Sequence, residues 1–244
     1  MRNIILGVSA LALAAVATPV LAQDEATDGF SVVGGAALVS DYRFRGLSQS
    51  GEEAAVQGYA TIKHDSGLYA GFWGSSVNFS VDGITNQSSE VDAIVGYARD
   101  LGGVTVDGGV TYYIYPGGTT ASTDVFEPYL SVSGAIGPVT AKVGAAYIFE
   151  GQNAAGDQDN IYLYTDLAAA IPSTPLTLKA HYGYSDGYIG AGGNYADYSV
   201  GATATWKALT FGASYVNTSG FANKAGREAL GADGAVVFSV SADF

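Results

Sequence analysis

The chain has 244 residues, with no cysteine, 34 glycines and 17 tyrosines, and its 10 Lys and Arg residues are outnumbered by 23 Asp and Glu residues, giving a formal net charge of −13. This is neither a disordered nor a disulfide-linked composition. Nucleic acid is disfavoured as a partner, because phosphate binding depends on clustered Lys and Arg.

The N-terminal segment has the features of an export signal. Arg2 precedes the short apolar stretch IILGVSALALAAVA, which is followed by TPVLA and then by the polar QDEATDG. This pattern predicts a secretory signal peptide over residues 1–22, cut after Ala22, and a short flexible lead-in over residues 23–29. No other window approaches the roughly 20 apolar residues of a membrane helix. We therefore expect export to the periplasm, the outer membrane or the medium.

From residue 30 to residue 244, apolar and polar residues alternate at nearly even spacing, which is typical of half-buried strands. In the last segment Val236, Phe238 and Val240 share one face, while Ser239 and Asp243 share the other. The alternation predicts twelve strands, most of them close to the roughly 9–11 residues that a membrane strand needs. Their expected ranges are 30–44, 54–64, 68–77, 89–99, 104–115, 126–136, 139–149, 160–171, 176–184, 197–206, 209–216 and 234–244.

The connections between these strands alternate in length. Short links (DSG, DLGG, GP, PSTP and KA) alternate with long segments rich in Gly, Asn, Ser, Thr and Asp. An even number of strands with short turns on one side and long loops on the other is the layout of a bacterial outer-membrane barrel. We predict an all-β protein: one transmembrane antiparallel β-barrel of about twelve strands over residues 30–244, with short periplasmic turns and long extracellular loops.

A secreted β-sandwich or a lipocalin-like barrel would also alternate, but aromatic residues near the ends of the apolar faces favour the membrane barrel. Such residues form girdles at the two membrane interfaces. The predicted membrane-interface aromatics are Phe30, Tyr42, Phe44, Trp73, Tyr97, Phe126, Trp206 and Phe244. The terminal Phe244 resembles the C-terminal signal that the outer-membrane barrel assembly machinery recognises, so this machinery and outer-membrane lipid are expected partners.

The stretch SDYRFRGLSQS, residues 40–50, alternates charged and aromatic residues. If Tyr42 and Phe44 continue the apolar face of the first strand, the charges between them point into the lumen, since a lipid-facing Arg would cost about 2–4 kcal/mol. The arginines either pair with lumen carboxylates and tie the wall together or act directly on permeating solutes. The inward-facing candidates for a pore lining or constriction are Asp41, Arg43, Arg45, Gln57, Asp92, Asp107, Glu127, Lys142, Glu150, Asp166, Lys179 and His181.

Three segments, VSDYRFRGLSQS, GLYAGFWGSSVNFS and SSEVDAIVGYARDLGG, resemble the opening blocks of the TorF family of proteobacterial porins. The resemblance is specific over the first third of the chain and extends over the rest by length, alternation and the terminal strand. SSVNFS departs from the family pattern, which has an acidic residue close to Asn78. The resemblance implies an outer-membrane barrel with diffusion-channel activity, without naming a solute or any catalytic residue.

The sequence contains little that indicates catalysis or metal binding. The two histidines, His64 and His181, are far apart and neither lies near a nucleophile motif, so we predict no catalytic residue, no metal and no cofactor. We expect a monomeric porin that lets small hydrophilic solutes or ions diffuse passively, and not an enzyme. The alternatives are a non-conducting structural or adhesion barrel that acts through its surface loops and, third, an outer-membrane hydrolase.

Overall fold

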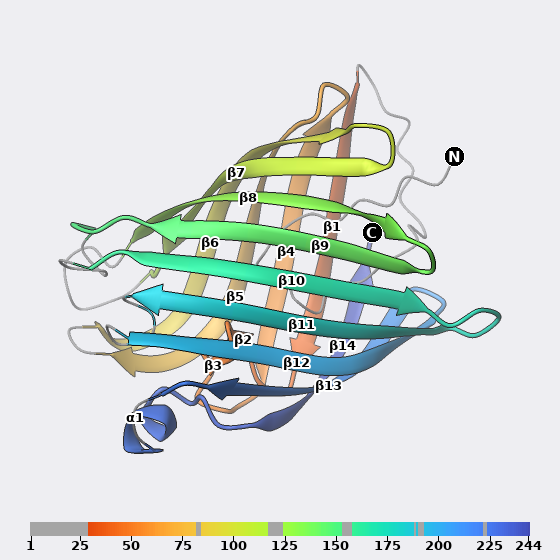
Figure 1. Cartoon of the computed structure of the whole chain (residues 1–244). Coiled ribbons are helices and arrows are strands. Elements are labelled where there is room, and N and C mark those ends of the chain that lie inside the picture. Colours follow the sequence, from red (N-terminus) through yellow and green to blue (C-terminus); the bar gives the residue numbers. More distant parts are fainter. Residues whose placement is uncertain are drawn as a thin grey trace.

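The computed structural model describes residues 29–81, 84–116, 124–152, 158–187, 189, 193–221 and 224–244. Within these residues, twelve antiparallel strands close into one barrel (Figure 1). The predicted fold class is therefore confirmed. The described part of the chain contains no helix that is long and apolar enough to cross a membrane. The predicted signal peptide and residues 23–28 of the lead-in lie outside the described residues.

The order of strands around the barrel is β1, β14, β13, β12, β11, β10, β9, β8, β7, β6, β5 and β4. Closure joins the first strand to the last, with Ala36 opposite Ala242 and Leu38 opposite Val240. The barrel strands are β1 (Phe30–Val39), β4 (Ala55–His64), β5 (Leu68–Val81), β6 (Ile84–Asp100), β7 (Val104–Ile114), β8 (Val125–Ile136), β9 (Val139–Ile148), β10 (Asn160–Ala170), β11 (Leu176–Gly187), β12 (Gly193–Trp206), β13 (Leu209–Ser219) and β14 (Ala235–Asp243).

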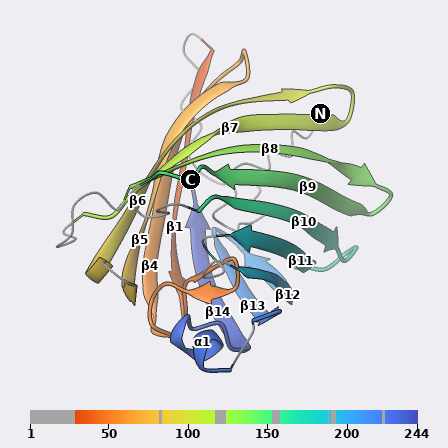
Figure 2. The ribbon, with the colours of Figure 1, turned by 60° about the vertical axis from the view of Figure 1, so that its left-hand side comes forward.

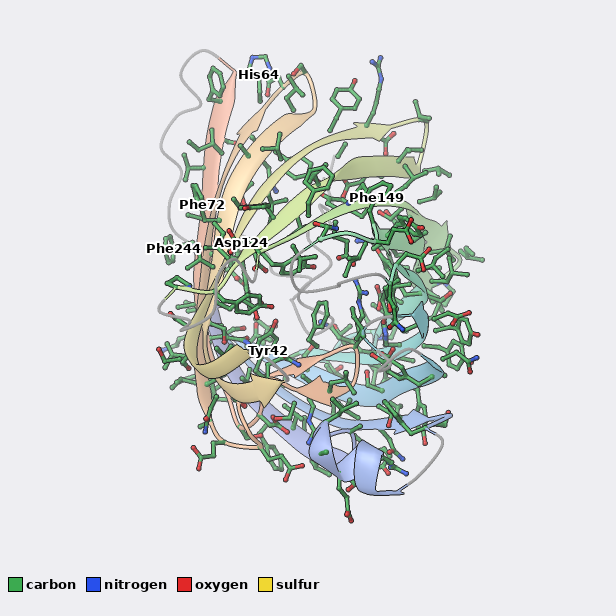
Figure 3. All side chains as sticks on the ribbon, turned by 90° about the vertical axis from the view of Figure 1, so that its left-hand side faces the viewer. Tyr42, His64, Phe72, Asp124, Phe149 and Phe244 are labelled. Carbon is green, nitrogen blue, oxygen red and sulfur yellow. The ribbon has the colours of Figure 1, made fainter. Side chains whose placement is uncertain are left out.

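The two faces of the wall differ sharply, as the alternation predicts. In the middle of β8, Leu130 is 57% exposed on the outside, whereas the next residue, Ser131, is 3% exposed on the inside. Phe72 and Phe244 lie outside the ring of strands in Figure 3, and Tyr42 lies within it. The outer face is thus largely apolar, and the inner face carries the polar and charged side chains.

The chain departs from the predicted strands in three places. β1 ends at Val39 instead of residue 44, and the two-residue strands β2 (Arg43–Phe44) and β3 (Leu47–Ser48) form a small hairpin inside the barrel (Figure 2). β5 and β6 run on through most of the segment predicted as a long loop, with a register shift after Ser76. In the last long loop, residues Lys224–Ala229 form a short helix, α1.

Three of the predicted interface aromatics lie inside the barrel, so that prediction is wrong for them. Trp73 is 2% exposed because outward residues of β5 have even numbers, as Phe72 does. Tyr42 and Phe44 follow the end of β1, where the chain leaves the wall and turns inward. The other predicted interface aromatics are exposed on the outer face: Phe30, Tyr97, Phe126, Trp206 and Phe244.

The apolar outer face predicts a specific sensitivity to charge. We expect Leu130→Arg to lower the free energy of unfolding in phospholipid bilayers by about 2–4 kcal/mol, because Leu130 lies midway along β8 and the guanidinium would face hydrocarbon. Leu101→Arg, in a short turn, should cost about 1 kcal/mol or less. Urea unfolding of both variants measures this, and equal losses would contradict a lipid-facing β8.

Candidate functional site

The segment of residues 40–50, here called the inward hairpin, leaves the wall after β1 and turns back at Arg45 and Gly46. Both residues have positive φ, 50° and 81°, as in the two-residue type I′ turn. A Cβ added at Gly46 would lie 2.6 Å from Cγ2 of Thr218 and 2.8 Å from Cβ of Asp197. Glycine therefore serves twice here, since it permits the turn and lets the tip approach β12 and β13.

The base of the inward hairpin is held by an ion pair and by backbone carbonyls. Arg43 Nε donates to Asp41 Oδ2 at 2.5 Å, and Ser48 Oγ donates to Asp41 Oδ1 at 2.7 Å. Arg43 Nη1 also donates to the carbonyl oxygens of Gly231 and Asp233, the latter at 3.0 Å. These bonds connect the first long loop of the barrel to the last one.

The tip of the inward hairpin is held by a buried ion pair. Arg45 Nη2 lies 2.5 Å from Glu127 Oε1, and both side chains are about 5% exposed or less. The guanidinium also lies over the ring of Tyr162, 4.1 Å from its centroid. Burial lowers the pKa of Arg45, but the carboxylate of Glu127 outweighs burial and leaves this pKa raised, so the guanidinium stays charged.

This ion pair extends the inward hairpin across the whole barrel interior. The inward hairpin starts from β1, whereas Glu127 belongs to β8 and Tyr162 to β10. In the ring order these two strands flank β9, which is the strand opposite β1. Tyr195 of β12 adds a hydrogen bond from its hydroxyl to the carbonyl oxygen of Arg45 at 3.0 Å. The segment therefore bridges opposite walls.

The near wall contacts the inward hairpin through Tyr42. Its ring packs against Trp73 of β5 with centroids 5.2 Å apart, and its hydroxyl donates to Glu90 Oε1 of β6 at 3.0 Å. Burial raises the pKa of Tyr42, and the negative charges of Glu90 and Asp92 raise it further, so its hydroxyl remains a donor. Aromatic packing and this hydrogen bond fix the inward hairpin against β5 and β6.

A second cluster surrounds His181 on β11. Its Nδ1 lies 2.6 Å from Asp166 Oδ1, and its Nε2 lies 2.9 Å from both Asp197 Oδ1 and the hydroxyl of Tyr162. Both ring nitrogens of His181 are therefore engaged by side chains of the neighbouring strands. Tyr162 belongs to this cluster and also contacts Arg45, so the two groups of charges are connected.

Further toward the short turns, the inner face carries hydrogen-bonded phenols and a lysine. The hydroxyl of Tyr69 donates to Asp107 Oδ1 at 2.7 Å and is bonded to the hydroxyl of Tyr129. Lys142, on β9, lies with its Nζ 5.7 Å from the ring centroid of Tyr164. The wall here has rings that alternate with ionisable groups.

The structure places most predicted inward candidates on the interior side. Asp41, Arg43 and Arg45 are there as part of the inward hairpin, and the candidates on strands share the inner face: Gln57, Asp92, Asp107, Glu127, Lys142, Asp166, Lys179 and His181. Glu150 is the exception, because β9 ends at Ile148 and Glu150 is exposed beyond it, so its place in the lumen stays a prediction.

The ion pairs bring together Asp41 with Arg43, Arg45 with Glu127 and Asp166 with His181. The candidate set lacked Asp197, which contacts His181 and the tip of the inward hairpin. Asp197 shares the parity of the inward residues Ser199 and Thr203. The predicted strand 197–206 already contains Asp197, so its parity was a sufficient signal to include it.

The structure is similar to the solved structures of two porins. The NanC porin superposes with a TM-score of 0.56 at 13% identity, covering 88% of this chain and 99% of that one. The KdgM porin gives 0.55 at 9% identity, covering 88% and 98%. The fold is thus that of the porin barrels.

Residues 23–244 match the family described as "Bacterial protein of unknown function (Gcw_chp)", and the chain belongs to that family. No curated protein matches its sequence.

The buried pair at the tip predicts a large effect on stability. We expect Arg45→Met to lower the free energy of unfolding by about 3 kcal/mol, because Glu127 would be left buried without a cation. Adding Glu127→Gln should recover most of this loss. Arg227→Met, which breaks a more exposed pair with Asp233, should cost about 1 kcal/mol or less. Urea unfolding tests this, and equal losses for the two arginine variants would contradict it.

Proposed function

We propose that this protein is an outer-membrane porin through which small hydrophilic solutes and ions diffuse passively, and that the inward hairpin forms its constriction. The apolar outer face and the polar inner face support insertion in a bilayer. The resemblance of the first third of the sequence to the TorF porins and the porin fold support the same function.

The observation that carries this proposal is the charged segment that bridges the interior. Arg45 comes from the side of β1 and meets Glu127 on β8, so positive and negative charge face each other at one level of the barrel. Such a transverse arrangement acts on ions and on polar solutes that pass beside it. Asp41 and Arg43 hold the base of the same segment and complete the charged layer.

The proposal includes the location and partners of the protein. The predicted signal peptide of residues 1–22 would export the chain, and the last strand, which ends in Phe244, would serve as its recognition element for the barrel assembly machinery. The strands close without a second chain, which supports a monomer in the outer membrane. No cofactor is needed for passive diffusion.

A second candidate is a non-conducting barrel that acts through its surface loops. The close packing around the inward hairpin favours it, since Tyr42, Arg45 and Asp92 are 3%, 9% and 0% exposed. In that case the inward hairpin would be a plug that ties the loops to the wall, and its charges would serve stability alone.

Single-channel recording of the mature protein in planar bilayers separates the two candidates. We expect discrete conductance steps, and a variant in which Gly residues replace 43–48 should show steps several-fold larger, because side chains at the narrowest level are removed. Lys207→Gln, in a short turn, is the control and should conduct like the parent protein. Silence from both the parent and the glycine variant, with each shown to be folded, would overturn the pore and favour the second candidate.

A further inference from the structure

Asp92 is a buried carboxylate with no hydrogen-bond partner. Its side chain lies on the inner face of β6 and is 0% exposed, and neither Oδ1 nor Oδ2 has a partner among the described residues. An ionised carboxylate is costly to bury unless a cation or several donors compensate it. Glu127 is paired with Arg45, and Glu90 accepts from the hydroxyl of Tyr42, so Asp92 differs from both in having no partner at all.

The neighbours of Asp92 add negative charge without balancing it. Glu90 lies two residues earlier on the same face, is 2% exposed, and receives a hydrogen bond from the neutral hydroxyl of Tyr42. Glu127, which also interacts electrostatically with Asp92, is already paired with Arg45. Glu90 and Asp92 therefore form an acidic pair that no positive side chain in the described residues is shown to contact.

Arg45 itself does not serve as the missing partner. Its Nη1 also lacks an acceptor, but the guanidinium is held by Glu127 and by the ring of Tyr162 on the far wall. On the near wall, Trp73 is paired with Asp92 across β5 and β6, and its indole Nε1 likewise has no acceptor. Two residues paired across neighbouring strands thus carry an unsatisfied donor and an unsatisfied carboxylate, and one hydrated ion would satisfy both.

We propose that Glu90 and Asp92 bind one small inorganic cation from solution, at the point where the inward hairpin meets the near wall. The two carboxylates supply the charge, and a water of the ion accepts the indole N–H of Trp73. The described residues hold no group of three or more His, Cys, Asp or Glu side chains placed to chelate a metal, so the cation keeps part of its water shell. Potassium, sodium and calcium ions all fit this chemistry.

This site gives the proposed pore a preference for cations. The preference rests on the proposed function, whereas ion binding itself does not. Tyr42 contacts both Trp73 and Glu90, so the ion lies directly beside the inward hairpin. An ion at this level neutralises the acidic pair when it arrives and restores its charge when it leaves, which favours cations over anions in the passage.

Ion binding is tested first without any conduction. The unfolding temperature of the folded protein in detergent is measured in potassium chloride and in N-methyl-D-glucamine chloride at equal ionic strength, and again with calcium chloride. We expect potassium or calcium to raise it by about 4–8 °C at about thirty times the dissociation constant. Asp92→Asn keeps the shape of the side chain and should abolish the rise. Asp107→Asn, whose parent carboxylate accepts from Tyr69, should retain it.

The outcomes separate this inference from the pore itself. A rise that is lost in Asp92→Asn but kept in Asp107→Asn supports the site even if the barrel proves silent in bilayers, and the effective ion distinguishes a monovalent from a divalent occupant. No rise in the parent protein, or an equal rise in Asp92→Asn, overturns it. In a conducting barrel, Asp92→Asn should also lower the permeability ratio of potassium to chloride several-fold, and an unchanged ratio overturns the role in selectivity.

Discussion

A single ion pair, between Arg45 and Glu127, fixes the interior of this barrel. It joins a segment that leaves β1 to a strand almost opposite, and therefore determines which side chains the inward hairpin meets on the way. Because both partners are buried, their mutual attraction is weakly screened, and salt affects it less than it affects the surface charges. The ring of Tyr162 lies against the guanidinium, and the hydroxyl of Tyr113 donates to the other oxygen of Glu127, so wall residues hold both partners of the pair.

Alternation, together with the alternating loop lengths and the aromatic residues, predicts the barrel, because each wall strand has one apolar outer face and one polar inner face. Residues such as Asp107, Glu127 and Lys142 could be assigned to the interior from their parity within a strand. Parity within a strand does not predict which ion-pair or hydrogen-bond partner any of these residues has. Partners such as Glu127 for Arg45 lie 82 residues apart, and their meeting depends on the path of a loop.

The inward hairpin escaped prediction for a physical reason. Tyr42 and Phe44 continue the parity of β1, so the pattern shows no break where the strand ends at Val39. The break lies in the backbone, since Arg45 and Gly46 adopt positive φ. Arg-Gly is a weaker turn signal than Asn-Gly or Asp-Gly, and only the Gly marked it. Aromatic rings can pack against the inner wall of a barrel as readily as they can contact lipid on the outside. For this reason the prediction assigned Trp73 and Tyr42 to the wrong face.

The two arginines of the inward hairpin have different consequences for function. Arg43 is bound to Asp41 within its own segment and to backbone carbonyls of the last loop, which have fixed positions and carry no net charge. Arg45 is bound to a side-chain carboxylate of the wall, and one of its terminal nitrogens has no acceptor. Since both side chains of the Arg45–Glu127 pair are buried, removing Arg45 leaves a buried charge on the wall, whereas removing Arg43 leaves neutral carbonyls on the last loop. Arg43 thus anchors the base of the inward hairpin to the last loop, and Arg45 anchors its tip to the far wall.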